Sequence, residues 1–124
     1  MKIENIKFKA KSIYNGEWVY GDLLHQSDGT HIYMGKSEGG HILCPRVDPS
    51  TVCQFTGMKD SEGNEIWEGD IVERKIYDLY KGFVKAKAVI EYSVGAFVAM
   101  VNIAPYPLWY RNIKVVGNKF DNEK

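Results

Sequence analysis

Residues 54–72 read QFTGMKDSEGNEIWEGDIV, and this stretch contains the clearest signals for antiparallel β structure. Turn-forming residues at 60–64 and the tripeptide Glu68-Gly69-Asp70 separate short apolar runs, so the chain is expected to turn sharply twice within about a dozen residues. The glycines at positions 63 and 69 can take the positive φ angles that such turns require. Asp70 can accept a hydrogen bond from a nearby backbone N–H group. The stretch therefore predicts short strands joined by tight turns.

Further turn signals on both sides of this stretch divide the chain into apolar runs of roughly four to eight residues, which is typical of strands. Asn15-Gly16 is the strongest hairpin signal, and it separates expected strands at 6–10 and 17–20. A second hairpin is expected between 84–92 and 96–101. The other expected elements are strands at 31–34, 41–44 and 113–116, one helical turn at 48–51, and a loop or edge strand at Pro105 and Pro107.

These elements predict a mainly β fold, of the β or α+β class. We expect a small antiparallel meander or a partly open SH3-like barrel, with at most short helical pieces. The aromatic share of 13% also favours strands over helices. Because 124 residues suffice for one hydrophobic core, a single domain over residues 1–124 is expected.

The composition argues against several classes of protein. Hydrophobic residues make up 44% of the chain and charged residues 26%, which is typical of an ordinary globular domain. No apolar stretch approaches the roughly 20 residues of a membrane-spanning helix. The first residues alternate lysine with apolar residues and do not resemble a signal peptide. We therefore expect a cytoplasmic protein that makes no membrane contact, in which Cys44 and Cys53 stay reduced.

The charge is balanced overall and uneven locally. Sixteen basic and sixteen acidic residues cancel, so the net charge gives no argument for a nucleic-acid partner. Residues 60–73, however, hold six acids and no base, whereas residues 74–87 hold five bases and one acid. Either the two blocks neutralise each other across neighbouring strands, or the second block forms a basic surface for a polyanion.

Residues with metal-binding or catalytic chemistry lack the expected spacing. The residue types suited to zinc do not form the two close pairs of a typical zinc site, so we expect no metal and no cofactor. Glu65, Glu68 and Asp70 can form the acid–base pair of a hydrolase only in a cleft with opposed pKa environments. The alternative is that Asp70 fixes a turn and the glutamates face water, and we expect no enzyme. The residues considered for zinc are His25, His31, His41, Cys44 and Cys53.

Residues 77–87 contain three aromatic and three basic side chains. Small β-barrels bind single-stranded nucleic acid by stacking bases on exposed aromatic side chains beside basic ones. In a β protein, aromatic residues more often belong to the core, so their exposure on a basic face is what would favour nucleic acid. This candidate nucleic-acid face consists of Tyr77, Tyr80, Lys81, Phe83, Lys85 and Lys87.

A second aromatic segment lies beside the two prolines. Prolines leave a sheet edge unable to pair, while aromatic side chains still favour burial against a partner. The alternative is that the segment folds back over its own sheet. A protein interface is the leading hypothesis, with a second copy of the chain or another protein as the partner, and nucleic-acid binding is the alternative to it. This candidate interface consists of Tyr106, Leu108, Trp109 and Tyr110.

Four segments of the chain resemble the YopX family of phage and prophage proteins. The longest carries the motif Q-F-T-G-x-K-D-x-x-G-x-x-I-x-E-G-D-I-V at 54–72, and the others lie at 6–10, 17–21 and 115–118. Lys9 stands where the family usually has arginine. The resemblance implies a mainly β, barrel-like domain from a phage or mobile element, with an unassigned biochemical role and no catalytic residues to carry over. We therefore expect a non-enzymatic accessory protein, whose protein partner is a second copy or another phage or host protein.

Overall fold

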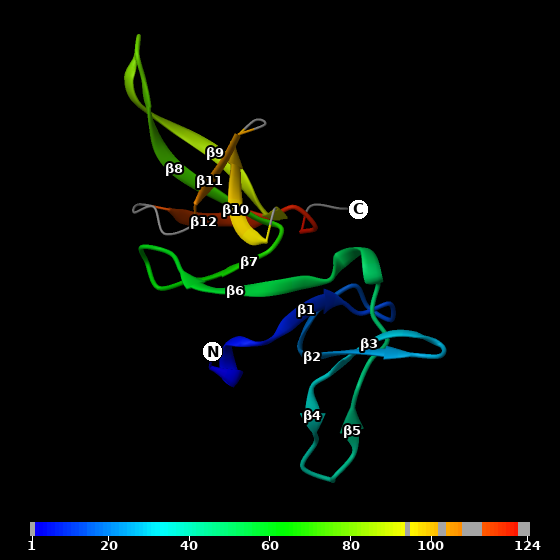
Figure 1. The fold of residues 1–124 in the computed structure, drawn as a ribbon. Helices are drawn as coiled ribbons and strands as arrows, with labels where there is room; N and C mark the ends of the chain where they lie inside the picture. The colour runs from blue at the N-terminus through cyan, green and yellow to red at the C-terminus, as the bar shows by residue number, and fades with distance from the viewer. Residues whose placement is uncertain (1, 94, 102–103, 108–112, 122–124) are drawn as a thin grey trace. The chain divides into compact units, whose positions relative to one another are not determined.

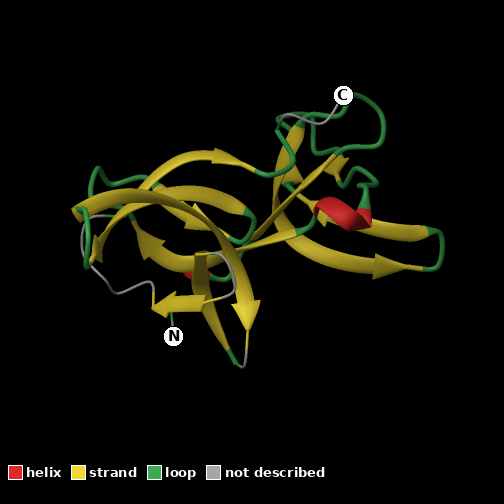
Figure 2. Ribbon diagram, turned by 90° about the horizontal axis from the view of Figure 1, so that it is seen from above, coloured by secondary structure: helices red, strands yellow, loops and turns green. Residues whose placement is uncertain are grey.

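The structure is a computed structural model that describes residues 2–93, 95–101, 104–107 and 113–121. Strands and turns make up nearly all of it, as Figure 2 shows. The described helices are single 3-10 turns, η1 (Ile3–Asn5) and η2 (Pro49–Thr51), and neither has the length or apolarity to span a membrane. The eight strand pairs with an assigned register among the described residues are antiparallel. The predicted mainly β, antiparallel fold is confirmed, and the described strands do not close into a barrel.

The chain divides into two compact units, Met1–Phe55 (unit 1) and Thr56–Lys124 (unit 2). Each unit has its own cluster of buried apolar side chains. Strand β6 (Cys53–Lys59) begins in unit 1 and continues into unit 2. The expectation of a single domain stays a prediction.

The strands of unit 1 are β1 (Phe8–Lys11), β2 (Trp18–Gln26), β3 (Gly29–Tyr33), β4 (Gly35–Lys36) and β5 (Ile42–Leu43), followed by η2 and the start of β6. The hairpin predicted at Asn15-Gly16 is observed between β1 and β2, with Gly16 at a φ of 72°. The helical turn expected at 48–51 is η2, where the Asp48 carboxylate accepts the Ser50 N–H at 3.0 Å. Ala10, Ile32 and Val47 form the buried core of this unit.

The strands that lie wholly in unit 2 are β7 (Glu65–Trp67), β8 (Asp70–Asp78), β9 (Gly82–Ser93), β10 (Ala96–Val101), β11 (Ala104–Pro107) and β12 (Lys114–Asn118). The last five form a sheet in the order β11-β10-β9-β8-β12 (Figure 1). Pro105 and Pro107 lie in β11 at the edge of this sheet, where a missing N–H group costs least, which confirms the edge strand expected there. Ile66, Val72 and Ile90 are the largest fully buried side chains of the unit 2 core.

Two aspartates fix the turns of unit 2 that the sequence predicted. The Asp60 carboxylate accepts N–H groups from Glu62, Asn64 and Val115 at 2.8–2.9 Å, so it joins the 60–64 loop to β12. Burial alone raises the pKa of Asp60, but these backbone hydrogen bonds outweigh burial and hold the pKa below its ordinary value of 3.8.

The second of these aspartates, Asp70, is buried at the start of β8. Its carboxylate accepts the Trp67 N–H at 2.7 Å, as expected for the Glu68-Gly69-Asp70 turn. The other carboxylate oxygen accepts the Asn118 side-chain amide at 3.0 Å, which ties the turn to the end of β12. Since the carboxyl group is buried and hydrogen-bonded on both oxygens, we interpret Asp70 as a structural residue.

The β8–β9 hairpin extends beyond the rest of its sheet. The pairing of β8 with β12 ends at Glu73, and the pairing of β9 with β10 begins at Val89. Between these positions the two strands pair only with each other, among the described residues. In Figure 1 they run past the ends of β10, β11 and β12 as a long two-stranded arm.

Candidate functional site

A three-residue loop closes the β8–β9 hairpin at its free end. Asp78 pairs with Gly82, and the Asp78 carboxylate accepts the N–H groups of Tyr80 and Lys81 at 2.8 and 3.0 Å. Gly82 takes a φ of 76°, the left-handed conformation that a three-residue hairpin loop requires after its turn. The hairpin tip, residues 79–81, is therefore held in shape while all three of its side chains remain exposed.

Alternation along the two strands places one set of side chains on a common face. Residues directly opposite each other in an antiparallel pair point to the same side of the sheet. The register pairs Tyr77 with Phe83, Lys75 with Lys85, and Glu73 with Lys87. Five of these six residues are exposed and Glu73 is half-buried, whereas Val72, Arg74 and Ala88 at the alternate positions are buried. We call these six residues the hairpin face.

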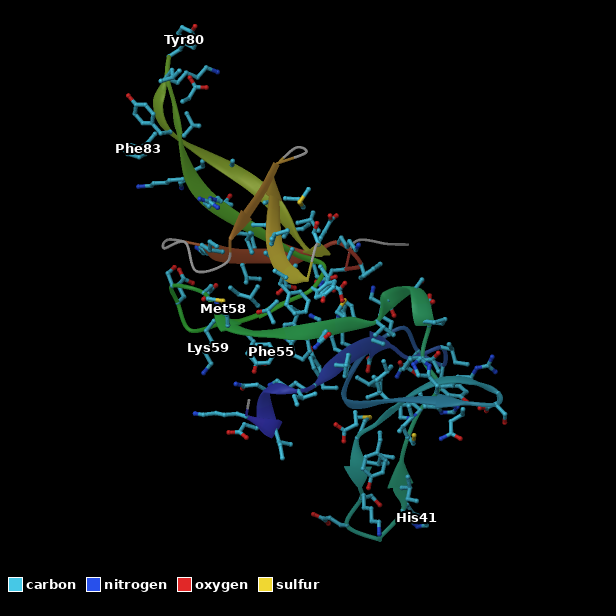
Figure 3. All side chains as sticks on the ribbon, viewed as in Figure 1. His41, Phe55, Met58, Lys59, Tyr80 and Phe83 are labelled. Carbon is cyan, nitrogen blue, oxygen red and sulfur yellow. The ribbon has the colours of Figure 1, made fainter. Side chains whose placement is uncertain are left out.

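The aromatic residues of the hairpin are the most exposed feature of this region. Tyr77 is 64% exposed, Phe83 76% and Tyr80 96%. The rings of Tyr77 and Phe83 lie edge to face, with centroids 5.3 Å apart. Figure 3 shows Phe83 beside the free end of the hairpin and Tyr80 at its tip. The expectation that aromatics belong to the core is wrong here, because no other strand covers this part of the hairpin among the described residues.

Basic residues continue the face toward the body of the sheet. Lys75 stands directly opposite Lys85, a like-charged pair that destabilises a sheet by about 0.2–1 kcal/mol when nothing compensates it. Glu73 has Lys87 opposite it on β9 and Lys114 opposite it on β12. The acidic block 60–73 and the basic block 74–87 therefore face each other at Glu73 but not at Lys75. The interpretation of mutual neutralisation applies to the base of the hairpin, and the interpretation of a basic surface applies to the part beyond it.

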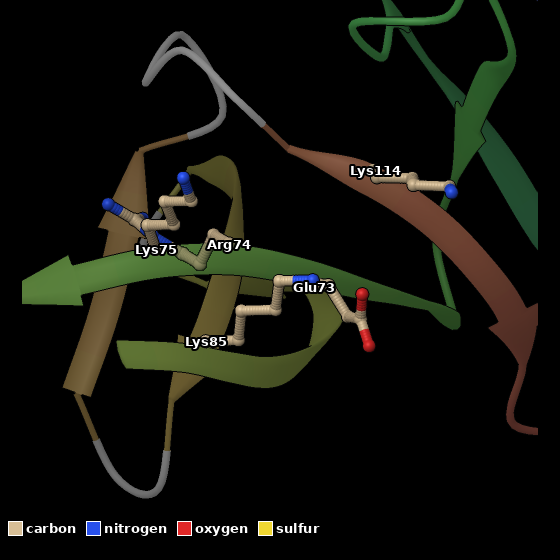
Figure 4. A pocket seen from close by; sticks show the side chains of 5 residues that line it. All are labelled: Glu73, Arg74, Lys75, Lys85 and Lys114. Carbon is tan, nitrogen blue, oxygen red and sulfur yellow. The ribbon is translucent and has the colours of Figure 1, made fainter. Parts of the chain in front are cut away.

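A shallow pocket of about 260 Å³ lies where this arm meets the sheet. Its lining combines four cationic side chains with one carboxylate (Figure 4). Lys114 also forms a salt bridge with Glu62, 3.5 Å from Nζ to Oε1, in which both side chains are about half exposed. The lining residues are Glu73, Arg74, Lys75, Lys85 and Lys114.

The sequence predicted only part of this site. Tyr77, Tyr80, Lys81, Phe83, Lys85 and Lys87 were expected to form one face, and the structure brings all six together on the arm and its tip. Four lining residues of the pocket were missed: Arg74, Lys75, Glu73 and Lys114. The sequence signal that could have found Arg74 and Lys75 is Asp78-Leu79-Tyr80-Lys81-Gly82. This pattern fits a three-residue hairpin loop, which places Lys75 opposite Lys85.

The other candidate sites are not assembled in the described structure. Tyr106 lies in β11, and the remaining interface residues, Leu108, Trp109 and Tyr110, lie outside the described residues. Of the carboxylates considered for catalysis, Asp70 holds its turn as described above, and Glu65 and Glu68 are half-buried.

The residues considered for zinc are separated or used in local hydrogen bonds. No group of three metal-binding side chains gathers among the residues that the structure describes. His31 contacts the Cys44 carbonyl through Nδ1 at 3.0 Å and the Asp28 carboxylate through Nε2 at 2.9 Å. These two hydrogen bonds, the first being the stronger influence, raise the pKa of His31 above its ordinary value of 6.5. Cys53 is buried, with its Sγ donating to the Thr51 carbonyl at 3.3 Å.

Comparison with protein-family models gives a match to the family described as YopX protein, over residues 2–124. The chain belongs to the YopX family. No curated protein matches it. The resemblance on which the YopX assignment was predicted is therefore confirmed across essentially the whole chain.

The segments that carry the YopX resemblance have structural roles. In unit 1, the ammonium of Lys9 lies 4.5 Å from the centroid of the Trp18 ring, and a Cβ atom at Gly21 would collide with the Tyr33 carbonyl oxygen. In unit 2, Asp60 and Asp70 make the hydrogen bonds that join the long motif to β12. The candidate face at 73–87 lies almost entirely outside these segments, so the family match does not assign it a role.

Proposed function

We propose that this YopX family member is a non-enzymatic accessory protein of a phage or prophage, which binds single-stranded nucleic acid through its hairpin face in the cytoplasm of a bacterial host. One observation supports the proposal above the others. Tyr77, Tyr80 and Phe83 are all exposed on an arm whose other exposed side chains are mainly lysines.

Exposed aromatic rings do not gain the free energy of burial when the protein folds, but they can gain it when a ligand binds. Burying an apolar side chain stabilises a folded protein by about 1.5–3 kcal/mol, and the two rings of the hairpin face do not gain this by folding. A base stacked on an aromatic side chain contributes roughly 1–3 kcal/mol, and stacking does not depend on sequence. The lysines beside the rings supply attraction to the phosphates. The net charge of zero is consistent with this role because residues 74–87 alone hold five bases and one acid.

The test is fluorescence anisotropy with a labelled oligothymidine of about 15 nucleotides, within the usual range of single-strand sites. We expect binding that weakens as salt rises. The double variant Tyr77→Ala, Phe83→Ala is expected to bind at least about tenfold more weakly, because two stacking surfaces are lost. Tyr92→Ala is the matched control, since Tyr92 is also exposed and makes a similar edge-to-face contact with Phe97.

Tyr92→Ala should leave the affinity within about twofold of the wild type, because Tyr92 lies outside the basic segment. Absence of binding by the wild-type protein, or equal losses in the double variant and the control, would refute the proposal. Light scattering on the same samples measures the mass in solution. A stable oligomer that ignores the oligonucleotide would support instead the predicted protein interface around Trp109.

A further inference from the structure

The pocket at the base of the arm differs chemically from the aromatic part of the hairpin face. Three strands contribute to it: Lys75 from β8, Lys85 from β9 and Lys114 from β12. Arg74, which also lines the pocket, is only 3% exposed, whereas the three lysines are exposed. The pocket thus presents exposed ammonium groups from three strands, while the Arg74 side chain is buried.

The charges in this pocket favour an anion with more than one negative charge. Four of the five lining side chains are cationic, and Glu73 is the single carboxylate among them. The Glu62 salt bridge offsets Lys114 only in part, because a pair between exposed side chains contributes little. An anion between Lys75 and Lys85 removes the repulsion of this directly opposed pair.

The pocket volume limits the size of the group. At about 260 Å³ it is smaller than the roughly 300–1,000 Å³ typical of sites for drug-sized ligands. A phosphate monoester fits the chemistry, since it carries about −1.5 to −2 charges at pH 7 and three acceptor oxygens. A phosphodiester inside a strand carries one charge, so it gains less from the same lining.

The position of the pocket connects it to the aromatic side chains. Lys75 precedes Tyr77 by two residues and Lys85 follows Phe83 by two, which separates each pair by about 7 Å along the same face. From this geometry we infer that the pocket holds the terminal phosphate monoester of a nucleic-acid strand, whose adjacent bases stack on Tyr77 and Phe83. The inference rests on the proposed function and adds recognition of the strand end to it.

The experiment compares three unlabelled oligonucleotides of one sequence as competitors for the labelled strand: one with a 5′-phosphate, one with a 3′-phosphate and one with hydroxyls at both ends. One phosphorylated form is expected to compete at least about tenfold better than the hydroxyl form, which corresponds to about 1.4 kcal/mol. The identity of the better competitor shows which strand end enters the pocket.

Variants then locate the preference. In Lys75→Gln, Lys85→Gln the ratio between phosphorylated and hydroxyl forms is expected to fall to within about twofold of one, because the charges opposite the monoester are gone. Lys81→Gln at the tip should weaken all three competitors and keep the ratio. Thermal unfolding of each variant checks that it folds.

The possible failures are distinguishable. If the wild type binds all three oligonucleotides equally, end recognition is wrong and single-strand binding stands. If the wild type binds none of them, the proposed function is wrong. A preference that survives in Lys75→Gln, Lys85→Gln also overturns the inference, because it places the monoester elsewhere.

Discussion

The two ends of the β8–β9 hairpin have the same secondary structure and opposite surroundings. At the anchored end, Val72, Ala88 and Ile90 are part of the unit 2 core, and β10 and β12 pair with the outer edges of the hairpin. At the free end, Tyr77 and Phe83 are exposed and the strands pair only with each other, among the described residues. One element thus supplies both packing and a free surface.

Two aromatic pairs, each with one member on β9, show the difference between the two ends. Tyr77–Phe83 and Tyr92–Phe97 have nearly the same geometry, with ring centroids 5.3 Å apart in both and interplanar angles of 73° and 72°. Phe97 packs against the core, whereas Phe83 is 76% exposed. Ring geometry alone therefore does not distinguish a structural pair from the proposed binding pair, whereas the neighbouring charges and the burial of the rings differ between them.

The largest expected effect separates the two aspartates at the ends of β8. Asp70 and Asp78 each accept two hydrogen bonds, but Asp70 is buried and the bonds of Asp78 lie in an exposed turn. We expect Asp70→Ala to lower the free energy of unfolding by about 3–5 kcal/mol, because two buried donors lose their acceptor and each costs about 1–3 kcal/mol. Asp78→Ala should cost about 1 kcal/mol or less. Urea denaturation measures both.

A milder substitution keeps this comparison testable if Asp70→Ala does not fold. Asp70→Asn retains one acceptor oxygen and is expected to lie between the alanine variant and the wild type. Equal costs at the two ends of β8 would contradict the distinction between an anchored and a free end.

Sequence reasoning succeeded where local chemistry determines the structure. Asn15-Gly16 and Glu68-Gly69-Asp70 specify turns through a few neighbouring residues, and both turns were predicted correctly. The partners of Asp60 and Asp70 in β12 were not predicted, because nothing local indicates which distant strand will supply Val115 and Asn118. Two aspartates of the family motif thus make long-range hydrogen bonds that only the structure reveals.

The candidate site shows the same division. Its aromatic and basic residues were found because they are close in sequence. The pocket was missed because Lys114 reaches it from a strand 40 residues downstream of Arg74, through pairing with Glu73. Exposure also could not be predicted, since an alternating aromatic and polar pattern fits a strand with one covered face as well as an uncovered one.

A smaller effect on stability is expected when the pH is lowered, and it comes from Asp60 in unit 2. Folding lowers the pKa of Asp60 below 3.8, so its ionised form stabilises the folded chain at any pH above the ordinary value. This contribution is lost as the pH falls through the lowered pKa. We expect Asp60→Asn to be less stable than the wild type at pH 7, and the difference to shrink below about pH 4. Thermal unfolding of both proteins between about pH 2.5 and pH 7 measures this difference in stability. A constant difference would show that the charge of Asp60 contributes nothing.

The smallest expected effect tests the tip of the free end through salt dependence. A protein that neutralises Z phosphates of a single strand loses affinity with a slope of about −0.7Z in log K against log salt concentration. Lys81 is exposed at the tip, next to Tyr80, and its replacement by glutamine should reduce the magnitude of the slope by about 0.7. Lys36→Gln is the matched control, because Lys36 is also an exposed lysine and lies on the β4–β5 hairpin of unit 1. Its slope should equal that of the wild type. Equal slopes for all three proteins would show that the tip is not part of the binding surface and would confine recognition to the hairpin face. An equal reduction of the slope in both variants would instead indicate attraction to the molecule as a whole.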